Sequence, residues 1–243
     1  YCCCCIHAFN SFKKDRAYIK VSSKQSTVNS LLKEILKAGA TELGLALGNN
    51  EISLFLKYLA ELKEWNKKIN LTAITDDRDI IIKHFLDSLT LVPFLTNQKT
   101  LLDIGSGAGF PCIPLKIVLP ELKATLMDSV NKKVIFMKHI IRALGLKNIE
   151  AIQARVENKE VMKKFDSSFD VVTSRAFAEL GKFLDIAAPY AKKGGMLLAI
   201  KGPKGIEELN GLKDLEGIES VKAKEVRLPF SDITTTILCF RKD

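Results

Sequence analysis

The stretch KTLLDIGSGAGFPCIP, Lys99–Pro114, organises the rest of the chain. Its apolar run from Leu101 to Ile104 is bounded by turn residues and predicts a buried parallel strand. A helical pattern resumes near Leu115, and the turn before it holds three glycines: Gly105, Gly107 and Gly109. Glycine permits a positive φ and lets a ligand approach the backbone closely. A strand, a glycine turn and a helix start together predict the nucleotide-binding corner of a doubly wound α/β fold.

Two details of this corner favour one kind of nucleotide. The spacing is G-x-G-x-G, whereas dinucleotide enzymes carry G-x-G-x-x-G. An acid, Asp103, stands directly before the turn, where it can meet an amino acid end of a cofactor. We therefore expect a site for S-adenosyl-L-methionine; the alternative is a tight turn that binds nothing.

Composition limits the class of protein. The chain has 243 residues, 47% of them hydrophobic, which suits one large α/β domain with a small appendage. A formal net charge of +9, from 37 Lys and Arg against 28 Asp and Glu, favours a polyanionic partner, RNA first. No apolar run approaches the ~20 residues that span a bilayer, and no signal-peptide pattern is present. We expect a cytoplasmic protein without a membrane partner and, as the default, a monomer.

The N-terminus carries four consecutive cysteines, Cys2 to Cys5, near His7. Neighbouring cysteines lack the spacing of zinc sites and of disulfide frameworks, so no metal is expected. Residues 1–27 lack periodicity and are predicted to be a poorly ordered extension.

The remaining chain divides into two parts. Residues 28–98 predict a helical cap with helices at Val28–Ala38, at Asn50–Lys68, and from Asp76 or Asp77 to Val92, where Pro93 ends the last one. Residues 99–243 alternate strands and helices, which predicts a mostly parallel sheet with helices on both faces. The expected helices are Ile113–Leu119, Asn131–Leu144, Glu157–Lys164 and Glu179–Ala191. The expected strands are Thr100–Ile104, Ala124–Met127, Ile149–Gln153, Asp170–Thr173, Met196–Ile200 after a Gly194-Gly195 turn, and an antiparallel edge pair, Val221–Arg227 and Thr234–Phe240.

Polar residues follow the expected strands where ligands bind in such sheets. Asp128 and Ser129 follow the second strand, where an acid accepts hydrogen bonds from ribose hydroxyls. The third strand is followed by Arg155, Val156 and Glu157, where an adenine would lie. The fourth is followed by Ser174 to Phe177, and the fifth ends in Lys201. Each residue alone has a structural alternative: Asp128 as a helix cap, and the charged residues as surface ion pairs or solvated loop groups.

Several segments together resemble the bacterial small-subunit (16S) ribosomal RNA guanine-N7 methyltransferase family, also called glucose-inhibited division protein B. They are LLDIGSGAGFPCIPL, LMDSVNKKVIFM, Arg155-Val156-Glu157, FDVVTSRAFAEL and LLAIKG, with WNKKINLTAI and KHFLDSL upstream. The resemblance runs from about Leu31 to the C-terminus. It implies a class I methyltransferase with a Rossmann-like, seven-stranded, mostly parallel sheet that uses S-adenosyl-L-methionine, releases S-adenosyl-L-homocysteine and methylates one guanine of 16S ribosomal RNA.

The resemblance also implies which residues bind. By matching position, the cofactor contacts are Gly105, Phe110, Asp128, Ser129, Val156, Glu157 and Arg175, and Gly107 of the same glycine turn is a further candidate. Candidate RNA contacts are Lys201, Asn70, His84 and Arg155; Asn70 and His84 have a structural alternative as helix-end residues. The chain departs from the family at Cys112, where glycine is usual, at Asp232-Ile233, where an acid–arginine pair is usual, and in its N-terminal extension.

The predicted chemistry needs positioning and no general base. Guanine N7 has a lone pair and no hydrogen, so the enzyme has only to align it with the methyl group, a task we assign to Arg175. The N7 edge lies in a groove of A-form RNA that side chains cannot read, so the target base must be unpaired. Two alternatives remain: a methyltransferase of small molecules or proteins, and a nicotinamide-dependent dehydrogenase or non-catalytic nucleotide-binding module.

Overall fold

The structure is a computed structural model that describes residues 28–175, 179–212 and 216–243. The predicted N-terminal extension, and Ala176 and Phe177 of the predicted site, lie outside the described residues. The helices are one over residues 28–42, α2 (Asn49–Ile69), α3 (Asp77–Ile80), the π-helix η1 (Ile81–Leu86), α4 (Asp87–Leu89), α5 (Val92–Leu95), α6 (Cys112–Val118), α7 (Asn131–Ala143), α8 (Lys159–Phe165), α9 (Leu180–Ala187), the 3-10 helix η2 (Ala188–Tyr190) and α10 (Gly205–Asn210). The strands are β1 (Thr100–Ile104), β2 (Lys123–Asp128), β3 (Ile149–Gln153), β4 (Phe169–Arg175), β5 (Ala191–Lys201), β6 (Ile218–Arg227) and β7 (Thr234–Lys242).

The seven strands form one sheet in the order β3-β2-β1-β4-β5-β7-β6. The first five strands pair in parallel, and β7 runs antiparallel to both β5 and β6. The strand order reverses between β1 and β4, so the ends of these two strands lie at the switch point where ligands bind in such sheets. The predicted seven-stranded, mostly parallel sheet with its antiparallel final pair is confirmed.

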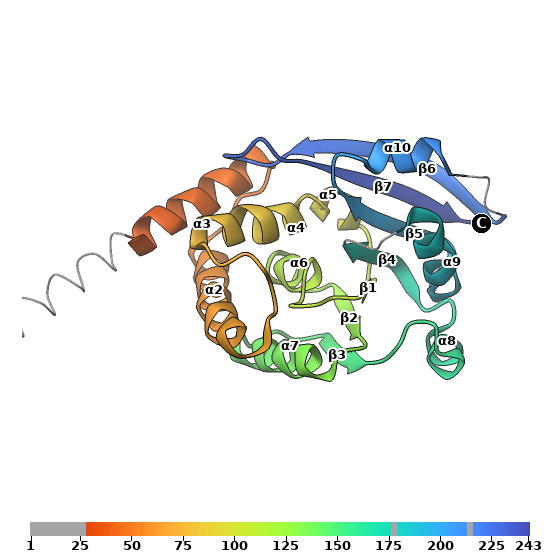
Figure 1. Cartoon of the computed structure of the whole chain (residues 1–243), viewed down its shortest axis with the longest axis horizontal. Coiled ribbons are helices and arrows are strands. Elements are labelled where there is room, and N and C mark those ends of the chain that lie inside the picture. The colour runs from red at the N-terminus through yellow and green to blue at the C-terminus, as the bar shows by residue number, and fades with distance from the viewer. Residues whose placement is uncertain (1–27, 176–178, 213–215) are drawn as a thin grey trace, which may run out of the picture.

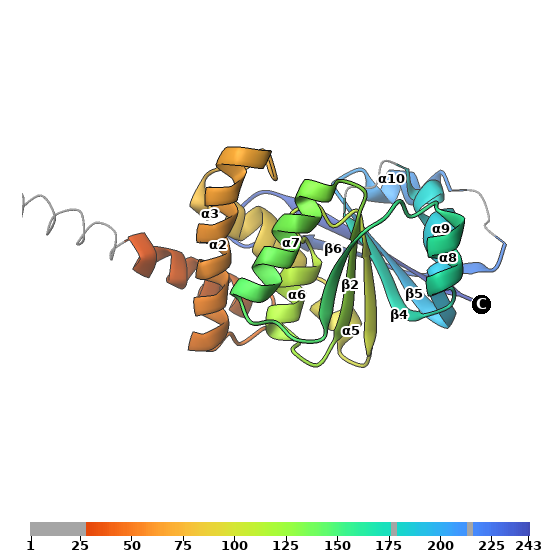
Figure 2. The ribbon, with the colours of Figure 1, turned by 90° about the horizontal axis from the view of Figure 1, so that it is seen from below.

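Helices cover both faces of the sheet, as Figures 1 and 2 show: α6, α7 and α2 lie on one side, and α8 and α9 on the other. One apolar core lies under α6, α7 and the helices of residues 28–95, and joins Leu36, Phe55 and Phe85 to Ile113 and Leu126. A second core, on the other face, includes Phe183 and Leu184 of α9. The helical segment predicted as a cap therefore shares one continuous core with the sheet.

The third predicted helix differs from the prediction. It begins as expected, because the Asp76 side chain caps α3 by accepting a hydrogen bond from the backbone N–H of Asp79. It then passes through the π-helical turn η1 and ends at Leu89. Pro93 does not terminate a helix, since it lies in the first turn of α5, where its missing N–H leaves no hydrogen bond unmade.

The C-terminal side also differs from the prediction, in one helix end, one helix that was not expected and one turn. The helix expected to reach Ala191 ends at Ala187, and the short helix α10 was not predicted. The turn expected at Gly194 and Gly195 lies inside β5, whose register with β4 jumps from the pair Phe169–Ala191 to Val171–Met196. Gly194 has a φ of +71°, so the glycines form an irregularity within the strand.

Candidate functional site

The glycine turn after β1 folds back onto β2. The backbone N–H groups of Gly105 and Ser106 both donate to the carbonyl oxygen of Met127, at 2.8 and 3.2 Å. Gly105, Gly107 and Gly109 have φ values of +71°, +60° and +95°, a region that side-chain-bearing residues rarely adopt. A Cβ at Gly109 would lie 2.4 Å from Ile113 Cδ1, whereas one at Gly105 would meet no atom within 4 Å. The turn therefore needs glycine for packing at Gly109 and leaves open space above Gly105.

Asp128, the last residue of β2, holds this turn in place. Its Oδ2 accepts a hydrogen bond from the N–H of Gly107 at 2.9 Å, and its Oδ1 accepts one from the N–H of Val130 at 2.8 Å. Asp128 is not the N-cap of α7, since the N-cap is Val130 and no side chain caps this helix, but its carboxylate fixes Val130 and also lines a cavity. A carboxylate has about four acceptor sites, so two remain for ligand hydroxyls.

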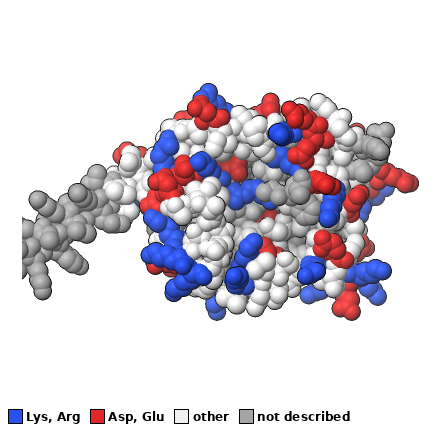
Figure 3. All heavy atoms as spheres, in the orientation of Figure 1, with Lys and Arg blue, Asp and Glu red and all other residues white. Residues whose placement is uncertain are grey.

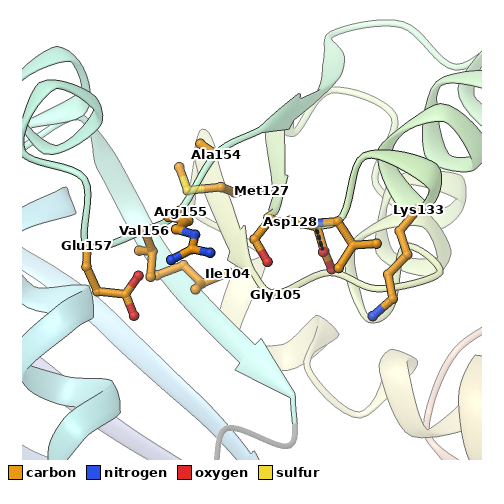
Figure 4. Close-up of a pocket in the computed structure, with 11 residues that line it drawn as sticks. Ile104, Gly105, Met127, Asp128, Lys133, Ala154, Arg155, Val156 and Glu157 are labelled. Atoms are coloured by element: carbon orange, nitrogen blue, oxygen red, sulfur yellow. Dashed lines mark hydrogen bonds between the residues drawn. The ribbon is translucent and has the colours of Figure 1, made fainter.

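A cavity of about 450 Å³ opens at the ends of β1, β2 and β3. Figure 4 shows the side chains that line it, which come from the glycine turn, the start of α7 and the segment after β3. Six predicted residues line it: Gly105, Asp128, Ser129, Arg155, Val156 and Glu157. Sequence reasoning missed Val130 and Lys133, although both follow Asp128 in the first turn of α7 and so face the same edge of the sheet.

Asp103 is buried within β1, directly behind the glycine turn. Among the described residues, neither of its carboxylate oxygens has a hydrogen-bond partner. Burial raises the pKa of Asp103 to about 8, although the nearby Ser106 hydroxyl and Cys112 backbone N–H, which do not reach hydrogen-bond geometry with the carboxyl, lower it. A buried carboxyl without partners is costly, and the raised pKa keeps this one protonated and neutral at pH 7.

These features fit S-adenosylmethionine. The open backbone at Gly105 accepts a chain that approaches closely, and Asp128 retains acceptor sites for ribose hydroxyls. Asp103, expected to meet the amino acid end of the cofactor, is fully buried and does not line the cavity. Val156 is buried and Glu157 exposed at the far side of the cavity, which provides an apolar and a polar contact for a base.

Phe110 and Arg175 form a second group, beside the cavity. The Arg175 guanidinium carbon lies 5.0 Å from the centre of the Phe110 ring, within the range of a cation–π contact. Arg175 Nη1 also lies 3.3 Å from the Lys83 carbonyl oxygen and 3.5 Å from Asp87 Oδ2. Arg175 follows Ser174, whose hydroxyl donates to the Ile104 carbonyl at 2.8 Å, so this group adjoins the start of the glycine turn.

His84 is buried behind Phe110. The two rings stack with their centres 4.5 Å apart, and His84 Nε2 lies 2.8 Å from Thr72 Oγ1. Burial first, and then the charge of Arg175, lower the pKa of His84 to about 3, so the ring is neutral at physiological pH. This placement favours the structural alternative for His84 over a contact with an RNA phosphate.

The other predicted RNA contacts lie at separate places. Asn70 is exposed at the end of α2, in the left-handed conformation that ends the helix, with a φ of 43°. Arg155 is exposed at the cavity rim. Lys201 is buried, and its ammonium group pairs with Glu208 of the unpredicted helix α10 at 2.6 Å.

Tyr58 is a further residue that sequence reasoning missed. Its hydroxyl donates to the Ala108 carbonyl of the glycine turn, and its ring lies 5.4 Å from that of Phe110. Burial raises the pKa of Tyr58 well above its usual value, so the hydroxyl keeps the proton it donates. Only the helical spacing of apolar residues in α2 hinted at this position, and that spacing does not distinguish a core residue from a turn support.

The part of the chain that the structure describes shows neither a metal centre nor a membrane span. In that part of the chain no group of three or more His, Cys, Asp or Glu side chains is arranged to hold a metal ion. Within the same residues, no helix combines the length and apolarity needed to cross a bilayer.

Solved structures share this fold. A SAM-dependent methyltransferase from Aquifex aeolicus aligns with a TM-score of 0.52 and 20% identity, over 75% of this chain and 97% of that one. A predicted O-methyltransferase from Agrobacterium tumefaciens aligns with a TM-score of 0.53 and 19% identity, over 64% of this chain and 80% of that one. The sheet order and the glycine turn define a class I, Rossmann-like fold, which these structures share.

Sequence comparison then identifies the family. The family described as rRNA small subunit methyltransferase G matches residues 51–232, and the chain belongs to this family. A relative from Geotalea uraniireducens is 44% identical over 218 residues, covering 88% of this chain and 99% of the relative. A relative from Thermoanaerobacter sp. (strain X514) is 43% identical over 215 residues, covering 86% of this chain and 89% of the relative. Both relatives are named Ribosomal RNA small subunit methyltransferase G.

Proposed function

We propose that this protein transfers the methyl group of S-adenosylmethionine to N7 of a guanine in small-subunit (16S) ribosomal RNA. The observation that carries the proposal is the family match over residues 51–232, which includes the glycine turn and every residue that lines the cavity. The names of the relatives supply the RNA, and the resemblance of the sequence motifs supplies the atom that is methylated.

The cavity residues have distinct roles in this proposal. Gly105 and Gly107 let the backbone approach the cofactor, and Asp128, which fixes Gly107, accepts from its ribose hydroxyls. Ser129, Val156 and Glu157 surround the adenine. When bound, S-adenosylmethionine supplies an electrophilic methyl group.

For the guanine that receives the methyl group, the protein has only to position the nucleobase, and it does not have to remove a proton. N7 of guanine attacks through its lone pair, so catalysis consists of aligning N7 with the methyl group and excluding water. Arg175, on its support of Phe110, lies between the cavity and the helical segment and orients the cofactor or an RNA phosphate. Its positive charge disfavours direct contact with N7, which becomes cationic as the reaction proceeds.

The RNA contacts in the proposal are the exposed residues Arg155 and Asn70. Lys201 would have to leave Glu208, and His84 would have to leave its stack on Phe110, before either reached RNA. The last turn of α2, with Lys67 and Lys68, adds positive charge, and Figure 3 shows basic side chains gathered over this helix. A monomer acting in the cytoplasm completes the proposal, since a ribosomal substrate requires neither a membrane nor a partner subunit.

Mapping of N7-methylguanine tests the proposal. Borohydride–aniline treatment breaks RNA at this base, and primer extension then locates the break in total RNA from cells with and without the gene. We expect one stop in the small-subunit RNA that disappears without the gene. The gene for Arg175→Ala should restore it poorly, whereas that for Lys147→Ala, an exposed residue preceding β3 at the opposite edge of the sheet, should restore it fully.

The same experiment decides against the alternatives. If every small-subunit stop persists without the gene, the RNA assignment fails and a small-molecule or protein acceptor takes its place. In purified form, methylation of small ribosomal subunits should also slow steeply as salt rises, because RNA binding by Lys and Arg releases counterions. A rate that does not respond to salt would contradict an RNA substrate.

A further inference from the structure

Asp87 joins three distant parts of the chain beside Arg175. It is the first residue of α4, and only 6% of its surface is exposed. Its Oδ1 accepts a hydrogen bond of 2.6 Å from the hydroxyl of Thr235, in β7. Its Oδ2 forms an ion pair of 3.5 Å with Nη1 of Arg175, at the end of β4. One carboxylate therefore ties the helical segment to the C-terminal hairpin and to Arg175.

The π-helical turn η1 supports the same guanidinium. The Lys83 carbonyl, within η1, accepts from Arg175 Nη1 at 3.3 Å, and Asp87 follows immediately after this turn. Short π-helical segments occur frequently at functional sites, where the altered winding redirects backbone and side-chain groups. Here the turn brings a carbonyl and a carboxylate to one nitrogen of Arg175.

The guanidinium also contacts the glycine turn, because its carbon lies 5.0 Å from the centre of the Phe110 ring. Arg175 thus contacts both η1 and the glycine turn after β1. Its contacts with Lys83 and Asp87 engage Nη1 alone, and a guanidinium carries five N–H donors. The side chain keeps 20% of its surface exposed, so the other donors can meet a ligand.

We propose that Asp87 is a positioning residue which, fixed by the Thr235 hydroxyl, sets the Arg175 guanidinium for cofactor binding. This inference rests on the role given to Arg175 in the proposed function. A long charged side chain has many rotamers, and its entropy must be lost when a ligand binds. A buried carboxylate held by a second hydrogen bond removes much of that freedom beforehand, so less affinity is lost on binding.

Thr235 offers a test that leaves every charge in place. Thr235→Val removes the hydroxyl and keeps nearly the same side-chain shape, whereas Thr235→Ser keeps the hydroxyl. The matched control is Thr236→Val in the same strand, because the buried Thr236 hydroxyl has no hydrogen-bond partner among the described residues. Calorimetric titration with S-adenosylmethionine, without RNA, gives the dissociation constant, and thermal unfolding of each variant reports its fold.

We expect Thr235→Val to raise the dissociation constant about fivefold, the equivalent of about one hydrogen bond. Thr235→Ser and Thr236→Val should stay within about twofold of the unchanged protein by the same measure. In the Arg175→Ala background, Thr235→Val should have no further effect, which a general loss of stability would not explain. Asp87→Asn, which keeps a side-chain acceptor without the charge, is the second variant if Thr235→Val does not fold.

The inference would be overturned if Thr235→Val and Thr235→Ser bound the cofactor equally tightly. It would also be overturned if Thr235→Val lost the same affinity whether residue 175 was arginine or alanine. It would also fall if Arg175→Ala bound the cofactor as tightly as the unchanged protein. The RNA proposal can fail separately: a chain that shows these binding effects but leaves ribosomal RNA unmethylated would support the role of Asp87 and refute the RNA acceptor.

Discussion

The backbone N–H of Gly107 donates to the carboxylate of Asp128 across 2.9 Å, which joins the glycine turn after β1 to the end of β2. The other carboxylate oxygen of Asp128 accepts from Val130 at the start of α7. One side chain thus holds two of the three segments that build the cavity at the ends of β1, β2 and β3, and it lines that cavity itself.

Removing this carboxylate should therefore damage binding more than stability. We expect Asp128→Ala to weaken S-adenosylmethionine binding more than tenfold, because each hydrogen bond to a charged acceptor contributes about 1.5–3 kcal/mol. The dissociation constant of Asp128→Asn should lie between those of Asp128→Ala and the unchanged protein, because an amide keeps one acceptor oxygen where the carboxylate has two. Calorimetry measures both, with Asp166→Asn, an exposed carboxylate before β4, as the control. If Asp128→Ala bound S-adenosylmethionine as tightly as the control, the role of Asp128 in cofactor binding would be contradicted.

The two ends of the glycine turn should respond differently to alanine. Gly109→Ala combines a φ of +95° with a 2.4 Å clash against Ile113 Cδ1, so we expect a loss of about 2–4 kcal/mol in the free energy of unfolding. Gly105→Ala has the strained φ of +71° but no clash, so its loss should be about 1–2 kcal/mol.

Gly105→Ala should lose more cofactor affinity than Gly109→Ala, the reverse of their order in stability. Gly105 lines the cavity, so its added methyl group should weaken S-adenosylmethionine binding at least about tenfold. Urea unfolding and calorimetric titration of the same preparations give both quantities. A larger loss of stability in Gly105→Ala than in Gly109→Ala would contradict the packing that separates them.

Asp103 should make the stability of the cofactor-free protein depend on pH. Burial raises its pKa from the ordinary 3.8 to about 8 in the folded chain. Between these values the folded protein holds a proton that the unfolded chain has released, so stability is fully present below about pH 3.8 and declines until about pH 8.

The variant Asp103→Asn isolates this effect, because an amide of the same shape does not titrate. We expect the difference in unfolding free energy between the two proteins to shift in favour of Asp103→Asn as pH rises toward about 8, and to level off above it. Urea unfolding without cofactor at several pH values measures it. A constant difference from pH 4 to pH 9 would show that Asp103 titrates normally.

His84 should stay neutral throughout the physiological range. Burial and the nearby Arg175 charge lower its pKa to about 3, and its ring stacks on Phe110. Its ring resonances in an NMR titration should therefore not shift between pH 5 and pH 8. A titration midpoint near the usual 6.5 would mean that the ring reaches water and can bind phosphate.

The sequence alone was sufficient for the features that depend on local patterns. A short apolar run before a glycine turn predicted β1 and the nucleotide corner, and the alternation of strands and helices predicted the sheet class. Position at a strand end brought Asp128, Val156 and Glu157 to one cavity, because parallel strands direct their carboxyl ends to the same edge. These features follow from backbone geometry, which a local pattern specifies.

Only the tertiary structure decided the contacts between segments far apart in the chain. The link from Thr235 through Asp87 to Arg175 joins residues separated by as many as 148 positions. Neither the π-helical turn nor the burial of His84 against Phe110 follows from an apolar period, because both depend on how the helical segment packs on the sheet. Periodicity states that a residue is buried; which polar groups meet it there depends on the packing of the whole chain.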